Sequence, residues 1–227
     1  MYKLVLFDVG NMLVKDSKGV SEYMAESIRN IYGRIVTVDL GNYAGWTSQE
    51  IAEDVLRKDK MDEDEIKAKL NRIMEDLFYT YYNVAGHDKQ ILVDGSRELL
   101  AHLWKKDIQM GIMTGEAERI AKFRAEKTTI HGFFKFGAYG NDGKTFDDIA
   151  KSAVKKAEAE LRVGKGEILV VANSPRLIRG AKAAGMGAVG IADGKYSEHD
   201  LSSAGANLVV KSLKDKNRIL EFAESGR

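Results

Sequence analysis

Short apolar runs recur along the chain, and they constrain its fold more than any other feature. Each is only a few residues long and largely apolar, which is typical of strands in a parallel sheet covered on both faces. Amphipathic helical patterns such as Ser96–Lys106, Ala117–Lys127 and Asp147–Arg162 separate the later runs. This alternation predicts an α/β fold with Rossmann-like layers around a central, mostly parallel sheet. The predicted strands are Lys3–Val9, Ile108–Met113, Phe134–Ala138, Glu167–Ala172, Ala188–Ala192 and Asn207–Val210.

One stretch after the first strand breaks the alternation, because helical patterns follow one another there without a confident strand. The segment Thr47–Glu50, TSQE, is a capping-box sequence that predicts the start of the middle helix. We expect residues 16–89 to form a small helical domain over the functional edge of the sheet. Residues 1–15 and 90–227 would form the Rossmann-like core. The helical patterns are Ser21–Tyr32, Ser48–Lys58 and Asp62–Asn83.

Composition excludes several classes of function. Lys and Arg number 35 against 34 Asp and Glu, a net charge of +1, so the chain lacks the basic excess of a nucleic-acid binder. There is no cysteine, which excludes disulfides, thiolate metal sites and cysteine nucleophiles. No apolar stretch approaches the roughly 20 residues of a transmembrane helix, and Asp8 interrupts the first apolar run, unlike a signal peptide. We therefore expect no nucleic-acid or membrane partner, and a cytoplasmic location.

Polar groups follow several predicted strands, at the edge where open α/β sheets bind ligands. Asp8 is placed as a nucleophile toward phosphorus or a metal ligand, although Asp-x-Gly-Asn is also a turn sequence. Thr114 and Gly115 suit either a phosphate cradle or an ordinary helix cap. Lys144 would neutralise a phosphate or simply be solvated. Asn173 opens a polar turn that core packing does not explain.

Together and in this order, these segments resemble the haloacid dehalogenase superfamily of hydrolases, most of which are phosphatases. The similarity is to phosphoglycolate-phosphatase-like members that carry a helical cap, and it extends over nearly the whole chain. The segments that carry it are FDVGNML, YAGWTSQEI, IMTGEAE, FGAYGNDG, NSPRLIRGAKAAGM and GKYSEHDLSSAGANLVV.

The resemblance implies a mechanism and a set of residues. Asp8 would attack a phosphoryl group and form an aspartyl-phosphate that water hydrolyses, with Thr114 and Lys144 completing the catalytic set. Asn11, Thr114, Gly115 and Lys144 would bind the phosphate. The cap would exclude water and select the substrate.

Two of these motifs depart from the family pattern. Gly10 stands where the family usually has the aspartate that acts as general acid and base, a group typically worth about 10²–10⁴-fold in rate. Asn173 and Leu177 stand where the fourth motif usually has aspartates. The resemblance implies Mg²⁺ bound by Asp8, the Gly10 carbonyl and Asn173. With Asp8 as the single carboxylate, we expect that binding to be weak or absent.

These departures leave two functions open. One is a phosphomonoesterase of low activity that acts on a small phosphorylated metabolite. The other is a catalytically inactive relative that binds a phosphorylated ligand or a protein partner. Asp142 and Asp147 lie near the third motif and could restore the metal site. Monomer and homodimer fit the sequence equally well.

Overall fold

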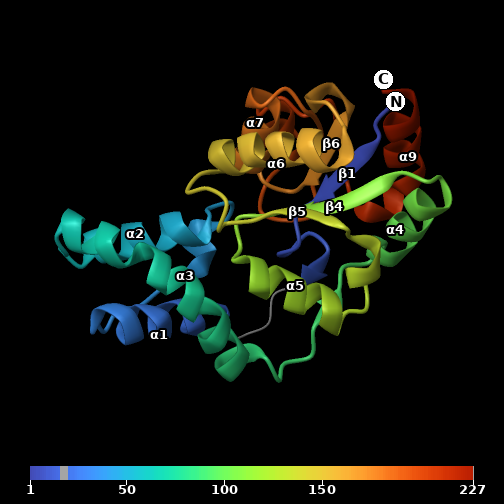
Figure 1. Ribbon diagram of the computed structural model, residues 1–227. Coiled ribbons are helices and arrows are strands. Elements are labelled where there is room, and N and C mark those ends of the chain that lie inside the picture. The colour runs from blue at the N-terminus through green and yellow to red at the C-terminus, as the bar shows by residue number, and fades with distance from the viewer. Residues whose placement is uncertain (16–19, 227) are drawn as a thin grey trace.

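A parallel six-stranded sheet forms the centre of the computed structural model, which describes residues 1–15 and 20–226. The strands are β1 (Leu4–Phe7), β4 (Gln109–Met113), β5 (Phe136–Ala138), β6 (Ile168–Ala172), β7 (Gly187–Ile191) and β8 (Leu208–Val210). Their order is β5-β4-β1-β6-β7-β8, and every neighbouring pair runs parallel (Figure 1). The first strand of the chain therefore lies inside the sheet, and the predicted fold class is confirmed.

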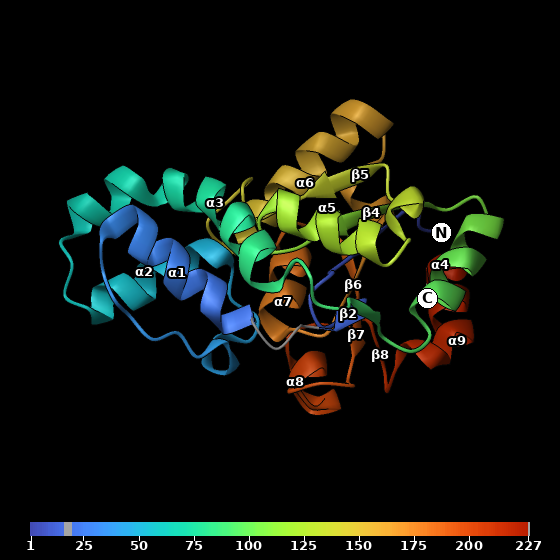
Figure 2. The ribbon, with the colours of Figure 1, turned by 90° about the horizontal axis from the view of Figure 1, so that it is seen from below.

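Helices cover both faces of this sheet (Figure 1, Figure 2). The helices of one face are α4 (Ser96–Lys105), α5 (Glu118–Lys127) and α9 (Lys216–Ser225), and those of the other are α6 (Phe146–Leu161), α7 (Pro175–Ala183) and α8 (Glu198–Ser203). Alternate side chains of β1 join different cores, since Val5 and Phe7 pack with the first set and Leu4 and Leu6 with the second. All four are fully buried, as expected for a strand covered on both faces. Single-turn helices lie at His131–Phe133, Lys165–Glu167 and Leu213–Asp215.

Three helices inserted after the first strand pack together into a helical unit, which we call the cap. They are α1 (Val20–Tyr32), α2 (Ser48–Lys58) and α3 (Glu63–Ala85), with a short 3₁₀ turn at Leu40–Tyr43. Their apolar faces make a core of their own, which includes Met24, Leu56 and Ile73 and extends to Ile120 of α5. In both ribbon views the cap lies to one side of the sheet (Figure 1, Figure 2).

A small antiparallel pair, β2 (Val14–Lys15) with β3 (Ile91–Leu92), joins the chain on its way into the cap to the chain on its way out. The sequence analysis missed this pair because two-residue strands leave no periodic signal. The predicted start of the cap at Asp16 lies outside the described residues. The division of the chain at residues 16 and 89 therefore stays a prediction.

The other predicted elements agree with the structure. Each predicted strand and helix overlaps an observed one, with ends that differ by at most two residues. The capping box is also present: the Thr47 hydroxyl accepts a hydrogen bond from the Glu50 N–H, and the Glu50 carboxylate accepts one from the Thr47 N–H. Local signals were sufficient here because short buried strands and capped amphipathic helices are defined by neighbouring residues.

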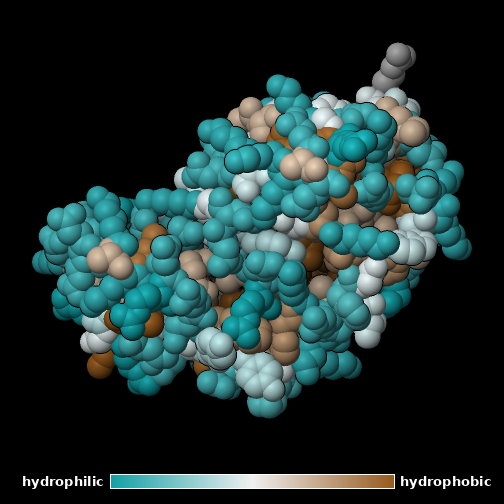
Figure 3. All heavy atoms as spheres, in the orientation of Figure 1, coloured by the Kyte–Doolittle hydropathy of each residue, from teal (hydrophilic) through white to brown (hydrophobic). Residues whose placement is uncertain are grey.

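The surface seen in Figure 3 is mostly hydrophilic, with apolar side chains scattered over it. Within the described part of the chain, no helix combines the length and the apolar character needed to cross a bilayer.

Thr47 links the cap to the core, which generates a stability prediction. Its hydroxyl caps α2 and also donates a hydrogen bond to the Lys144 carbonyl of the core, at 2.5 Å. We expect Thr47→Ala to lower the free energy of unfolding by about 1–2 kcal/mol, because both interactions are lost. Thr47→Ser should recover most of that loss in urea unfolding.

Ser197 provides the matched control, because its hydroxyl caps α8 without reaching another domain. Ser197→Ala should cost less than Thr47→Ala. Equal losses in the two variants would contradict a contribution from the contact between cap and core.

Candidate functional site

Asp8 lies directly after β1, at the carboxyl edge of the sheet. Its Oδ1 accepts hydrogen bonds from the Val9 N–H at 2.9 Å and from the Thr114 hydroxyl at 2.7 Å. Thr114 is in reach because β1 and β4 are paired in register, with Phe7 opposite Ile112. Parallel pairing thus places the ends of both strands side by side, as the sequence predicted from their strand-end positions.

Burial dominates the electrostatics of Asp8. It raises the pKa of the Asp8 carboxyl to about 7, because an ionised carboxylate loses hydration there. The hydrogen bonds from Thr114 and Val9 oppose this shift. The negative charge of Glu116 adds to it, and the positive charge of Arg124 lowers it. A carboxyl so placed changes charge near neutrality, which is common for reactive groups.

A cavity of about 390 Å³ opens beside Asp8. Gly10, Asn11 and Asn173 also line it, so four residues predicted to bind phosphate or metal share one cavity. Ala44 and Gly45, from the segment between α1 and α2, line it as well. The volume is that of a small-molecule site.

Other predicted site residues lie at the boundary between cap and core. Lys144 forms an ion pair at 2.5 Å with Glu53 of α2, whose side chain is buried. Gly115 contacts the cap closely: its carbonyl accepts a hydrogen bond from the Ser48 N–H at 2.9 Å, and a β-carbon on Gly115 would lie 2.9 Å from the Cα of Thr47. Neither residue lines the cavity of Asp8.

The donor set for a metal is small. Asp8 and Asp193 are the carboxylates that line the cavity, with neutral oxygens from Gly10 and Asn173 nearby. The Asn173 amide donates to the Asn11 carbonyl at 3.1 Å and also hydrogen bonds to Asp193, whose pKa is raised by burial. Among residues 1–15 and 20–226, no group of three or more His, Cys, Asp or Glu side chains is arranged around a possible metal position. These donors fit Mg²⁺ only when a bound phosphate supplies further oxygens.

Two carboxylates that the sequence analysis considered as substitutes have other roles or positions. Asp142 forms an ion pair with Lys156 at 2.7 Å and accepts a hydrogen bond from the Tyr139 N–H, so it is engaged away from the cavity. Asp147 does not line the cavity either. Leu177, a residue of α7, is fully buried in the apolar core.

Sequence reasoning missed Asp193, Glu116 and Arg124. Asp193 lies two residues after the end of β7, and the strand-end rule that selected Asp8 would have found it. Glu116 and Arg124 have no such signal, because their pairing joins a loop to the middle of α5.

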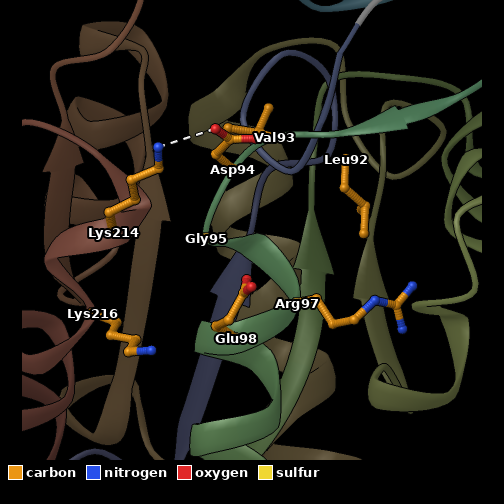
Figure 4. A pocket seen from close by; sticks show the side chains of 8 residues that line it. All are labelled: Leu92, Val93, Asp94, Gly95, Arg97, Glu98, Lys214 and Lys216. Atoms are coloured by element: carbon orange, nitrogen blue, oxygen red, sulfur yellow. Dashed lines mark ion pairs between the residues drawn. The ribbon is translucent and has the colours of Figure 1, made fainter.

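A second hollow of about 550 Å³ lies near the start of α4 (Figure 4). Lys214 reaches Asp94 across it in an ion pair of 3.1 Å between two exposed side chains. Arg97 extends away from that pair and donates to the Thr128 carbonyl at 2.7 Å. None of the site residues predicted from the sequence lines this hollow.

The chain belongs to the family of haloacid dehalogenase-like hydrolases, because the sequence model of that family matches residues 5–191. Its fold is that of several solved structures. A predicted phosphatase from Clostridium acetobutylicum is 20% identical, with a TM-score of 0.74, over 97% of this chain and 99% of that one. CbbY from Rhodobacter sphaeroides, solved with phosphate, is also 20% identical, with a TM-score of 0.73, over 94% and 95%.

A predicted phosphoglycolate phosphatase from Haemophilus somnus is 15% identical, with a TM-score of 0.71, over 96% of this chain and 98% of that one. A search of curated proteins finds no match. The predicted family is thus confirmed, and the three structures support the fold.

The buried carboxyl of Asp8 gives a stability prediction. Its pKa in the folded chain, about 7, exceeds its usual value of 3.8, so the protonated form favours folding. Its contribution is complete below about pH 4 and is lost as the pH rises through about 7. In metal-free buffer, Asp8→Asn should therefore raise the free energy of unfolding by about 2–4 kcal/mol near pH 8 and by little near pH 4.

Chemical denaturation at the two pH values measures this difference. Asp94→Asn removes an exposed carboxylate that is paired with Lys214, and it should bring no gain near pH 8. A pH-independent effect of Asp8→Asn would show that burial does not disfavour the ionised form.

Proposed function

We propose that this chain is a phosphomonoesterase that acts on a small phosphorylated metabolite through an aspartyl-phosphate on Asp8. The observation that carries the proposal is the placement of this carboxylate. Both hydrogen bonds that the described residues make to Asp8 end on Oδ1, so Oδ2 is the oxygen left for attack on phosphorus. The cavity for the substrate begins at the same residue.

The charge of the cavity supports an anionic substrate. Lys15 and Lys195 both line it, and Lys195 also donates to the Gly41 carbonyl of the cap at 2.9 Å. Two ammonium groups would attract a phosphate monoester and offset the carboxylates of Asp8 and Asp193. CbbY, which shares the fold, was solved with phosphate and with xylulose 1,5-bisphosphate. That fold therefore accommodates sugar phosphates.

Magnesium would be held by Asp8, the Gly10 carbonyl and Asn173, with Asp193 as a further carboxylate that lines the cavity. When bound, it would neutralise charge on the transferring phosphoryl group. The protein's own residues would do the rest: Thr114 orients Asp8, Asn11 lines the cavity that would hold the phosphate, and the cap excludes water. Because the metal site has few carboxylates, we expect low activity.

A second candidate is a binding protein without turnover. It is favoured by the ion pair of Lys144 with Glu53, since a lysine paired with the cap does not line the cavity of Asp8. Such a protein would retain the cavity and its two lysines, and would bind a phosphorylated ligand or a protein partner without cleaving the ester.

Phosphate release decides between the two. The wild-type chain is assayed on phosphorylated metabolites and an aryl phosphate, with Mg²⁺ and with a chelator, beside Asp8→Asn. We expect Mg²⁺-dependent release that falls about 10³-fold or more in Asp8→Asn, because the nucleophile is lost. Asp94→Asn, an exposed carboxylate elsewhere, should keep wild-type activity.

Absence of release above the Asp8→Asn background would contradict the phosphatase proposal. Retained binding of inorganic phosphate in both the wild type and Asp8→Asn would then favour the binding protein, and calorimetry measures it.

A further inference from the structure

The space next to Gly10 is already filled by another side chain. A β-carbon built on Gly10 would lie 2.7 Å from Oε1 of Glu116 and 3.4 Å from Nη1 of Arg124. Gly10 is not among the glycines with positive φ, so its backbone conformation does not require glycine. A side chain at residue 10 would therefore require the Glu116 carboxylate to move.

Arg124 holds that carboxylate in place. Its guanidinium forms an ion pair with Glu116, and its Nη2 donates to the Val14 carbonyl at 2.9 Å. The Arg124 side chain is 1% exposed, whereas that of Glu116 is 20% exposed. The guanidinium therefore fixes the position of the Glu116 carboxylate through a charge-assisted hydrogen bond. It also fixes the loop after β1 to α5.

Glu116 is connected to the nucleophile as well. The Glu116 N–H donates to the Thr114 hydroxyl at 3.3 Å, and that hydroxyl donates to Asp8 at 2.7 Å. Gly10, against which the Glu116 carboxylate lies, lines the same cavity as Asp8. One oxygen of Glu116 thus occupies the volume that a side chain at position 10 would fill.

Building on the proposed phosphatase function, we infer that Glu116 is the general base for hydrolysis of the aspartyl-phosphate, and that Arg124 is its positioning residue. Asp8 cannot serve as this base, because its carboxylate is esterified at that stage. Glu116, in the loop after β4, supplies the carboxylate that Gly10 lacks.

The step balances as follows. A water oxygen attacks phosphorus, and the bond between phosphorus and the Asp8 oxygen breaks. The electron pair of that bond returns to Asp8 as its carboxylate. The proton of the attacking water goes to Glu116, which passes it to solvent after inorganic phosphate leaves.

This role predicts that loss of Glu116 separates the two halves of the reaction. Acetyl phosphate and an aryl phosphate have leaving groups that depart without a proton donor, so both should still phosphorylate Asp8 in Glu116→Gln. Hydrolysis of the phosphoenzyme should slow about 10²–10⁴-fold. Intact-protein mass spectrometry after mixing with acetyl phosphate and Mg²⁺ should then show one added phosphoryl group, which is absent in the double variant with Asp8→Asn.

Two matched variants keep the test specific. Glu118→Gln changes a neighbouring glutamate that is paired with Lys122 on the surface of α5, and it should behave as wild type. Asp193→Asn removes the other carboxylate of the cavity. If Asp193→Asn accumulates the phosphoenzyme and Glu116→Gln does not, the base is Asp193 and the inference is overturned.

Transfer of the carboxylate to residue 10 gives a second test. Gly10→Asp alone should slow turnover, since the new side chain meets Glu116 at 2.7 Å and carries the same charge. Gly10→Asp with Glu116→Ala should recover at least about tenfold over Glu116→Ala. Arg124→Lys should slow dephosphorylation more than phosphorylation. Lysine keeps the positive charge, but it cannot contact the Glu116 carboxylate and the Val14 carbonyl with two separate nitrogens.

The outcomes distinguish this inference from the function on which it rests. If neither the wild type nor any variant is phosphorylated or releases phosphate, the phosphatase proposal fails and the inference fails with it. If the wild type turns over and Glu116→Gln keeps its rate within about twofold without a phosphoenzyme, only the inference is overturned. A faster Glu116→Gln would show that this carboxylate repels phosphate instead.

Discussion

The parallel pairing of β1 with β4 and β6 is the constraint on which the site depends. Phe7 lies opposite Ile112 on one side and Val171 on the other, so Asp8, Thr114 and Asn173 emerge at one edge of the sheet. The pairing is held by burial on both faces, since alternate residues of β1 enter two separate apolar cores. A register shift by one residue would exchange those faces, and it would also withdraw Asp8 from the Thr114 hydroxyl.

The same edge concentrates negative charge, and the fold balances it locally. Asp8 and Asp193 both have raised pKa values because burial disfavours their ionised forms. Arg124 forms an ion pair with Glu116, and Lys195 lines the cavity. A dianionic phosphate entering here would meet cations and carboxylates together. Binding of an anion in this cavity would therefore depend on protonation and on ligand charge as much as on shape.

The sequence was sufficient for whatever depends on neighbours along the chain. Short buried strands, the cap helices and the Thr47 capping box could be predicted, and so could the meeting of Asp8 with Thr114, because strand ends share an edge. Side-chain pairs between segments that are distant in the sequence could not be predicted. Glu116 lies in the space beside Gly10, and Glu53 forms an ion pair with Lys144. No local sequence pattern encodes either contact. The apparent loss of a carboxylate at Gly10 thus has a spatial explanation that only the fold reveals.

The contact between cap and core explains how Lys144 could serve a phosphate while it is paired elsewhere. Glu53 is buried, so leaving it without any cationic partner would cost about 3–5 kcal/mol. Glu53 has a second cation, however, since Arg57 lies 3.2 Å away on the same helix. Release of Lys144 to a ligand therefore leaves Glu53 paired. The cap can stay closed through Thr47 and Glu50, which contacts Arg176 at 2.5 Å, while the lysine changes partner.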